Sequence, residues 1–206
     1  MKPQDIESLS FHIIDQEAGD HGFDRRHWQI VRRMIHTSAD FEYIDSIRFP
    51  GDAVEAGIRA IRSGAAILTD TNMARVGIRK DLAATFGCRV SCLMTDPEVA
   101  RLAAADGGTR AEAAVDAAIP LMEGGIYVIG NAPTALLRLI RRMAQQKARP
   151  ALVVGLPVGF VNAAESKEEL VQAGITAITN VGRKGGSNVA ASVVNALAIM
   201  AAEARS

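Results

Sequence analysis

Apolar positions in the first 42 residues recur at the spacing of helices. Four apolar residues lie near one face of a first helix, which ends around Gly19: Ile6, Leu9, Ile13 and Ile14. Asp24 is placed to cap a second helix, whose apolar stripe consists of Trp28, Val31, Met34 and Ile35. The sequence therefore predicts a helical N-terminal segment over residues 1–42.

From residue 43 onward, short apolar runs alternate with helical stretches. The candidate strands are residues 43–49, 65–70, 88–94, 125–131, 150–157 and 176–182. Helical stretches between them include residues 52–64, 109–125, 132–146 and 163–174. Strands that are apolar throughout are buried on both faces, and crossover helices supply the two covers. The pattern predicts a three-layer α/β/α fold with a mostly parallel, doubly wound sheet.

The length of 206 residues is that of one large domain. We therefore expect a single domain over residues 1–206, with the helical segment 1–42 packed on the α/β core. The last segment, residues 186–204, is Ala-rich and apolar around much of its circumference. Such a helix is buried on more than one side, either under the sheet or against a second subunit. A homodimer is the expected assembly.

Charge narrows the range of partners. Lys plus Arg and Asp plus Glu both number 23, so no overall field attracts nucleic acid and no polybasic tail binds a membrane. No run reaches the ~18 apolar residues of a membrane span, and the amino terminus lacks a secretory pattern. Cys88 and Cys92 are too far apart along one strand for a disulfide and lack metal-ligand neighbours. We expect a cytoplasmic protein with two reduced core cysteines and no metal.

The turns after the apolar runs are the candidate ligand sites, because ligands bind outside the carboxyl ends of parallel strands. In the turn GRKGGSN, Gly182, Gly185 and Gly186 give backbone freedom, while Ser187 or Asn188 would cap the last helix. With Arg183 and Lys184, its free amides would form an anion site. A capped connection with two solvated cations fits the spacing equally well. The chain lacks both the P-loop and G-x-G-x-x-G, so nucleotide binding loses its usual support.

Two other turns allow a similar choice. Thr109 would cap the helix that follows it, while Arg110 projects from the first turn, where a cation suits the helix dipole poorly and an anionic partner would explain it. A plain surface arginine is the alternative. Asn131 and Thr134 are first of all turn and cap residues, and would contact a ligand only if the strand ends form the site.

His36 lies just beside the buried face of its helix, near the helix end. A histidine in such a place either packs with a hydrogen bond or uses an imidazole, which titrates near neutral pH, to give and take one proton. The chain has no G-x-S-x-G, no H-E-x-x-H and no nucleophile with an adjacent base, which disfavours hydrolysis. Proton chemistry without a metal is the simplest catalytic interpretation.

Seven segments together resemble one family, the precorrin-8X methylmutases of cobalamin biosynthesis, also called cobalt-precorrin-8 methylmutases. They are SFHIIDQE, VRRMIHTSAD, GAAILTDTNM, GTRAEAA, GNAPTALL, PVGFVNAAESKEEL and GRKGGSNVAAS, which span Ser10 to Ser192 in the order of the family. The resemblance implies an isomerase that moves a methyl group from C-11 to C-12 of the precorrin ring without an external cofactor. The product is hydrobyrinate or its cobalt form, cobyrinate.

The resemblance also implies residue roles. The histidine of the family's M-[IV]-H motif falls on His36, whose implied role is to protonate the macrocycle so that a [1,5]-sigmatropic shift can proceed. A flat apolar ring edged with carboxylates needs an apolar groove and scattered anion-binding turns, which the glycine-rich helix starts would supply. The expected substrate-binding set is Ser10, Thr109, Arg110, Asn131, Arg183, Gly185, Gly186 and Ser187.

Two rival functions remain at this point. A non-catalytic corrinoid carrier also uses a doubly wound sheet, but the D-x-H-x-x-G motif of carriers that displace the lower cobalamin ligand is missing. A nucleotide-dependent oxidoreductase is disfavoured by the missing glycine fingerprint.

Overall fold

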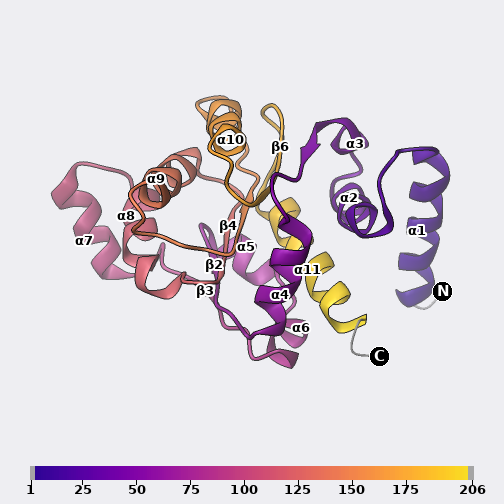
Figure 1. The fold of residues 1–206 in the computed structure, drawn as a ribbon, viewed down its shortest axis with the longest axis horizontal. Helices are drawn as coiled ribbons and strands as arrows, with labels where there is room; N and C mark the ends of the chain where they lie inside the picture. Colours follow the sequence, from indigo (N-terminus) through magenta and orange to yellow (C-terminus); the bar gives the residue numbers. More distant parts are fainter. Residues whose placement is uncertain (1–2, 204–206) are drawn as a thin grey trace.

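The computed structural model describes residues 3–203 and contains one six-stranded sheet (Figure 1). The strand order is β1-β6-β5-β4-β2-β3. All neighbouring strands are parallel except β1, which pairs antiparallel with β6. The strands are β1 (Ile47–Arg48), β2 (Ile67–Thr69), β3 (Val90–Cys92), β4 (Ile126–Ile129), β5 (Leu152–Gly155) and β6 (Ala177–Asn180). Of the domain expected over residues 1–206, residues 1–2 and 204–206 lie outside the described part.

Helices cover both faces of the sheet, which confirms the predicted three-layer fold. One face is covered by α4 (Ala53–Arg62), α5 (Asn72–Gly77), α6 (Lys80–Thr85) and α11 (Ser187–Glu203), and the other by α8 (Arg110–Ala118), α9 (Pro133–Ala144) and α10 (Ala163–Gln172). Helix α7 (Pro97–Asp106) packs on α8. Alternate residues of β4 divide between the layers: Ile126 and Val128 face α4 and α11, while Tyr127 and Ile129 face the other helices.

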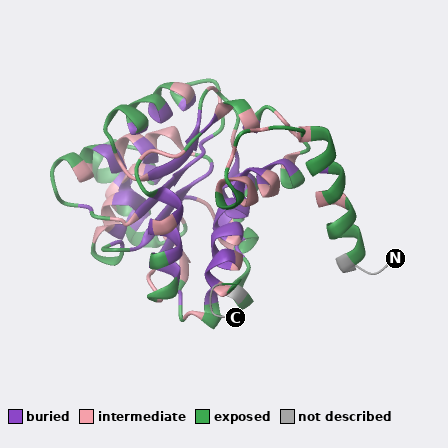
Figure 2. Cartoon of the chain, turned by 45° about the vertical axis from the view of Figure 1, so that its right-hand side comes forward, coloured by how far each residue is buried: buried purple, intermediate pink, exposed green. Residues whose placement is uncertain are grey.

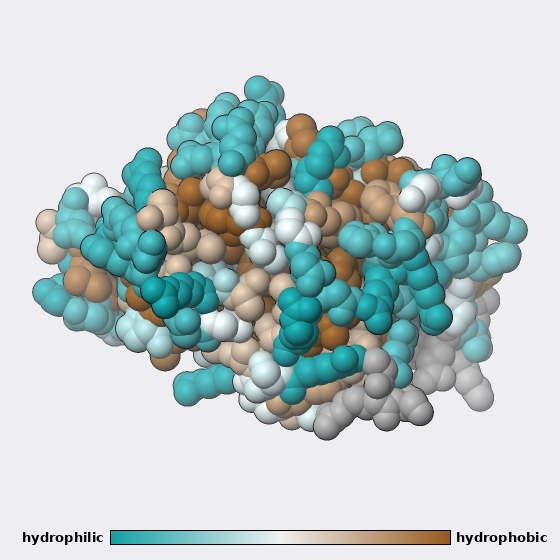
Figure 3. Space-filling model, in the orientation of Figure 1, coloured by the Kyte–Doolittle hydropathy of each residue, from teal (hydrophilic) through white to brown (hydrophobic). Residues whose placement is uncertain are grey.

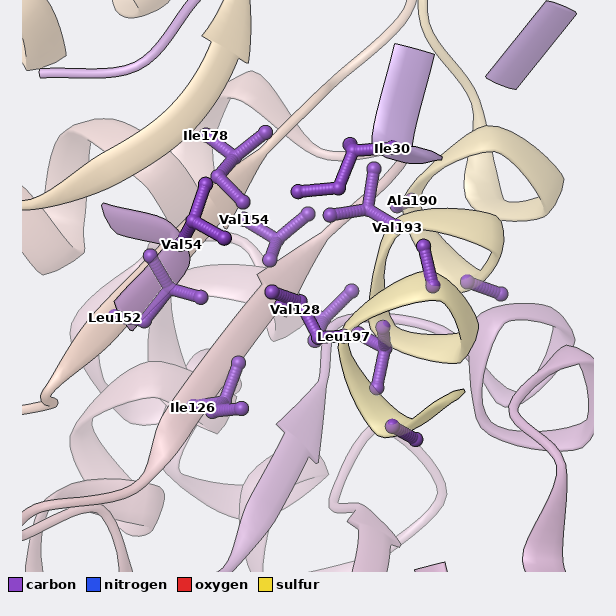
Figure 4. Close-up of a cluster of buried hydrophobic side chains, with 14 of the residues drawn as sticks. Ile30, Val54, Ile126, Val128, Leu152, Val154, Ile178, Ala190, Val193 and Leu197 are labelled. Carbon is purple, nitrogen blue, oxygen red and sulfur yellow. The ribbon is translucent and has the colours of Figure 1, made fainter. Parts of the chain in front are cut away.

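Helix α11 lies in the interior of its own chain. It packs against α2 (Arg25–Ser38), α4 and α5, and twelve of its residues are buried. Figure 4 shows Ala190, Val193 and Leu197 of this helix facing strand residues such as Val128 and Val154. Of the two predicted sites for this helix, it occupies the one under the sheet, so its apolar surface gives no support to a second subunit.

The N-terminal helices pack with very different amounts of buried surface. In α2, Asp24 accepts hydrogen bonds from the amides of Arg26 and His27 at 2.8 and 3.0 Å, which confirms the predicted cap. The stripe of α2 is buried at Val31, Met34 and Ile35. Helix α1 (Pro3–Ala18) buries only one of its four stripe residues, Ile14, while the others are exposed: Ile6, Leu9 and Ile13. Figure 2 shows α1 as a largely exposed helix at the side of the molecule.

The structure corrects the strand predicted over residues 43–49. Its first half is the short helix α3 (Tyr43–Ser46), and only Ile47 and Arg48 pair with β6. Tyr43 and Ile47 are both buried, and residues four apart lie on one face of a helix. They also lie on one face of a strand, so an apolar run this short does not distinguish the two structures. Helices α5, α6 and α7 are not among those predicted from the sequence.

Cys88 and Cys92 are both free, and Cys88 is buried. Within residues 3–203, the helices all fall short of the length and apolarity needed to cross a bilayer. The same residues contain no group of three or more His, Cys, Asp and Glu side chains arranged to hold a metal.

Candidate active site

The turns singled out in the sequence gather at one edge of the sheet, the carboxyl ends of β2, β4, β5 and β6. The chain runs from β2 to β3 on one side and returns to β4 on the other, so the strand order reverses between β2 and β4. Ligands of open α/β sheets bind at such a switch point. The turn after β6 lies between α10 and α3 at the top of Figure 1.

A buried carboxylate joins the two turns at the switch point. Asp70, directly after β2, is 2% exposed and accepts hydrogen bonds from the amides of Gly130, Asn131 and Ala132 at 3.0, 2.8 and 2.9 Å. Burial raises the pKa of this carboxyl, and the three amides, which favour the ionised form, oppose the rise. The turn after β4 is thereby fixed against the turn after β2.

The first residue of α11 contacts the same two turns. The hydroxyl oxygens of Thr71 and Ser187 are 2.8 Å apart. Gly130 has to be glycine, because a Cβ at this position would lie 2.5 Å from the Cα of Ser187. Helix α11 begins at Ser187, so the predicted cap at Ser187 or Asn188 is wrong: Gly186 precedes the helix, and the Ser187 hydroxyl contacts Thr71 instead.

The glycine-rich turn packs its backbone against the end of β5. The Gly186 amide donates to the Leu156 carbonyl at 2.9 Å, and a Cβ on Gly185 would lie 2.2 Å from that oxygen. Lys184, which is exposed, pairs with Asp40 and Glu42 at 2.6 and 2.9 Å. These ion pairs connect the turn to the segment that follows α2.

Thr109 and Arg110 lie beside the turn after β4. Thr109 caps α8, as predicted, and the cap is a capping box with Glu112. The Thr109 hydroxyl is 3.2 Å from that of Thr134. Thr134 does not cap α9: the residue before that helix is Ala132, and no side chain caps there. Arg110 is exposed on the first turn of α8, and Asn131 is exposed in its turn. Thr109 and Thr134 thus bring α8 next to the switch point.

His36 is exposed on the last turn of α2, next to the buried Ile35. Its ring lies 5.0 Å from that of Phe11 on α1, in a tilted arrangement. Ser10 precedes Phe11, and its hydroxyl donates to the Ile6 carbonyl at 2.9 Å within α1. His36 and Ser10 therefore lie on the two packed helices α1 and α2. Asp40 and Glu42, which pair with Lys184, follow α2 in the chain.

An exposed apolar turn completes this edge. Phe160 and Val161, in the turn after β5, are 85% and 78% exposed, and the Arg183 guanidinium lies 5.6 Å from the Phe160 ring centre. Val158 and Val181 are also exposed here. Figure 3 shows hydrophobic side chains reaching the surface among hydrophilic ones along the upper edge. Apolar side chains beside cations suit a flat apolar ligand with anionic groups.

Comparison with known proteins decides the family. Residues 5–200 match the family described as precorrin-8X methylmutase. The chain belongs to the precorrin-8X methylmutase family. It is 48% identical over 202 residues to the cobalt-precorrin-8 methylmutase of Salmonella typhimurium, covering 95% of this chain and 94% of that protein. It is 39% identical over 197 residues to the precorrin-8X methylmutase of Pseudomonas aeruginosa, covering 95% and 94%.

A solved structure of the family has the same fold. The crystal structure of precorrin-8X methylmutase from Thermus thermophilus superposes with a TM-score of 0.90, at 48% identity, covering 98% of this chain and 97% of that one. The three-layer fold predicted for this chain is therefore also the fold of a solved precorrin-8X methylmutase.

Three residues at this edge are not among the predicted site residues: Asp70, Phe160 and Lys167. Asp70 follows a strand in which every residue is buried, where an acidic side chain needs hydrogen-bond donors. Phe160 lies in a turn with Pro157, Gly159 and Asn162 between a strand and a helix, where a large apolar residue has no core to join. Both signals were present in the motifs TDTNM and PVGFVNAAES.

Proposed function

We propose that the chain is a methylmutase that moves a ring methyl from C-11 to C-12 of precorrin-8X or cobalt-precorrin-8 in cobalamin biosynthesis. Family membership over residues 5–200 carries this proposal. The reaction is an isomerisation, so no atoms are gained or lost and no electrons are exchanged with a second reactant. The product is hydrobyrinate or cobyrinate.

We propose that His36 is the acid of this reaction. Its exposed imidazole donates a proton to the macrocycle, the methyl group migrates in a [1,5]-sigmatropic shift, and the imidazole then recovers a proton from the ring. The position of His36 on α2 supports this role. Asp40 and Glu42, which follow this helix, pair with Lys184 of the glycine-rich turn, so the imidazole lies at the end of α2 nearer that turn.

We propose that the ring binds along the strand-end edge, with its apolar plane toward Phe160 and Val161 and its carboxylates toward the turns. The expected contacts are the side chains of Ser10, Thr109, Arg110, Asn131, Arg183 and Ser187 and the amides of Gly185 and Gly186. The exposed apolar turn and the neighbouring Arg183 support this orientation.

Incubation of the purified protein with precorrin-8X tests the proposed function. A methylmutase changes the visible spectrum of the ring in the absence of NAD(P)H. Binding without conversion would indicate a corrinoid carrier, and a response only after nucleotide is added would indicate an oxidoreductase. Parallel kinetics with cobalt-precorrin-8 would establish which form of the ring is the natural substrate.

Arg110→Ala is expected to weaken binding of hydrobyrinate about ten-fold, the loss typical of one charge-assisted contact. The guanidinium is exposed on the first turn of α8, beside the switch point, so its removal leaves the core unchanged. An absorbance titration measures the dissociation constant. Arg101→Ala, an exposed arginine on α7 paired with Glu98, is the matched control. An unchanged dissociation constant in Arg110→Ala would show that Arg110 is a surface residue that does not contact the ligand.

We propose that the chain is a single domain over residues 1–206 that forms a homodimer through α1 and acts in the cytoplasm. Exposed Ile6, Leu9 and Ile13 on one stripe of α1 support this interface, and two free cysteines support a reducing compartment. Light scattering of Leu9→Asp is expected to give the chain mass of 21.9 kDa, and the unaltered protein twice that mass. Val171→Asp, at an exposed apolar residue of α10, is expected to remain dimeric. A monomeric unaltered protein would refute the assembly.

A further inference from the structure

Lys167 is a lysine buried inside the fold. It lies in the second turn of α10, in the motif AAESK, and is 1% exposed. Its amine donates to the Asn180 side-chain oxygen at 3.0 Å and to the Lys184 carbonyl oxygen at 2.7 Å. Among the residues that the structure describes, no carboxylate pairs with this amine. Lys167 is therefore a buried cation held only by neutral oxygens.

Such an arrangement is unfavourable for folding taken alone. A buried ammonium loses its hydration, and two neutral acceptors replace only part of it. Burial lowers the pKa of Lys167 to about 8, so the amine is still protonated in most molecules at pH 7. A methionine would fill the same space without this cost. The charge therefore calls for an explanation beyond packing.

The contact with the Lys184 carbonyl determines how the glycine-rich turn presents its backbone. The same oxygen also accepts from the Asn180 side-chain amide at 3.1 Å, so two buried donors hold it on the inner side of the turn. The carbonyl and the N–H of a trans peptide point in opposite directions, and the described chain has no cis peptide. The Gly185 amide therefore points away from Lys167, and within residues 3–203 it has no hydrogen-bond partner.

We propose that Lys167 is a positioning residue for the carboxylates of the substrate. It holds the Lys184 carbonyl so that the Gly185 amide faces the ligand, and it places a positive charge directly behind the turn. An anion bound at the turn then acts as the counter-ion that the amine lacks in the free protein. This inference rests on the proposed function, because it takes the carboxylated ring as the ligand.

The test compares two ligands in variants of the full chain. Hydrobyrinate carries carboxylates, and its carboxamide counterpart has the same ring without the charges. In Lys167→Met the carboxylated ring is expected to bind about ten-fold more weakly, with KM raised by a similar factor and kcat within about two-fold, since a charge-assisted contact is lost from binding. Binding of the carboxamide ring is expected to stay unchanged. A purely structural role would weaken both ligands together.

Two further variants make the result decisive. Lys167→Gln keeps a donor for the Lys184 carbonyl but removes the charge, and it should fold even if Lys167→Met does not. Lys147→Met removes an exposed lysine and controls for net charge. Equal preference for the carboxylated ring in the unaltered protein and in Lys167→Gln would overturn the proposal, as would failure of both variants to fold. If the unaltered protein binds neither ring, the proposed function itself fails.

Discussion

His36→Ala is expected to lower turnover of precorrin-8X by about 10²- to 10⁴-fold, the contribution of one positioned acid. This corresponds to about 2.7 to 5.5 kcal/mol in the activation barrier. The imidazole is the group proposed to protonate the ring, and alanine can neither donate a proton nor recover it. Stopped-flow absorbance on the visible band of the ring would measure the loss under single-turnover conditions.

The same substitution should leave the fold and ring binding intact. His36 is exposed, and alanine is the strongest helix former, so the free energy of unfolding should change by less than about 0.5 kcal/mol. The dissociation constant for hydrobyrinate should stay within a few-fold, because the apolar turn and the turns proposed to bind the carboxylates are unaltered. A loss confined to kcat would separate an acid from a residue that merely contacts the ring.

His27→Ala is the matched control for this experiment. His27 lies nine residues earlier on the same helix, at the end away from the glycine-rich turn, and its ring pairs with the capping Asp24. Turnover in this variant should be normal. Added imidazole should restore part of the turnover of His36→Ala, because the exposed position leaves room for a small molecule that donates and recovers a proton. Near-normal turnover in His36→Ala without imidazole would assign the histidine to packing.

The sheet could be predicted because its parallel strands are apolar throughout. All four residues of β4 and of β5 are buried, and such runs, separated by helical stretches, fit few other folds. Residues 43–49 show the limit of the method, since a run of three or four apolar positions fits helix and strand equally. The partner of α11 was a further ambiguity, because an all-round apolar helix can be covered equally well by its own chain or by another.

The gathering of the candidate turns could also be predicted, since parallel strands bring their carboxyl ends to one edge. Its internal connections could not be. Thr134 is expected to cap its own helix, yet it contacts Thr109, twenty-five residues earlier. Asp70 and Lys167 bind backbone groups, which every residue possesses, so no side-chain pattern marks their partners. The useful signal was a charged residue inside or directly beside a buried element.

Asp70→Ala is expected to lower the free energy of unfolding by about 3 kcal/mol, because it leaves three amides of the turn after β4 without their acceptor. The loss of three hydrogen bonds would cost more than this, but removing the buried carboxylate also removes its desolvation penalty. Urea unfolding followed by circular dichroism would measure the change. Turnover should fall as well, because the turn that carries Asn131 and approaches Ser187 loses its fixed position. Asp70→Asn keeps one acceptor oxygen but turns a donor toward the amides. Its free energy of unfolding should lie between those of the unaltered protein and Asp70→Ala.

Asp96→Ala distinguishes this role from ordinary capping. Asp96 also accepts a backbone hydrogen bond, from the Glu98 amide at 2.9 Å, but it does so at the exposed start of α7, after the edge strand β3 and not between β2 and β4. Its removal should cost about 1 kcal/mol and leave turnover unchanged. If Asp70→Ala were no more destabilising than Asp96→Ala, water would have to satisfy the three amides in its place. The turns after β2 and β4 would then be held together by packing alone, and the switch-point edge would owe its shape to Gly130 and Ser187 rather than to the buried carboxylate.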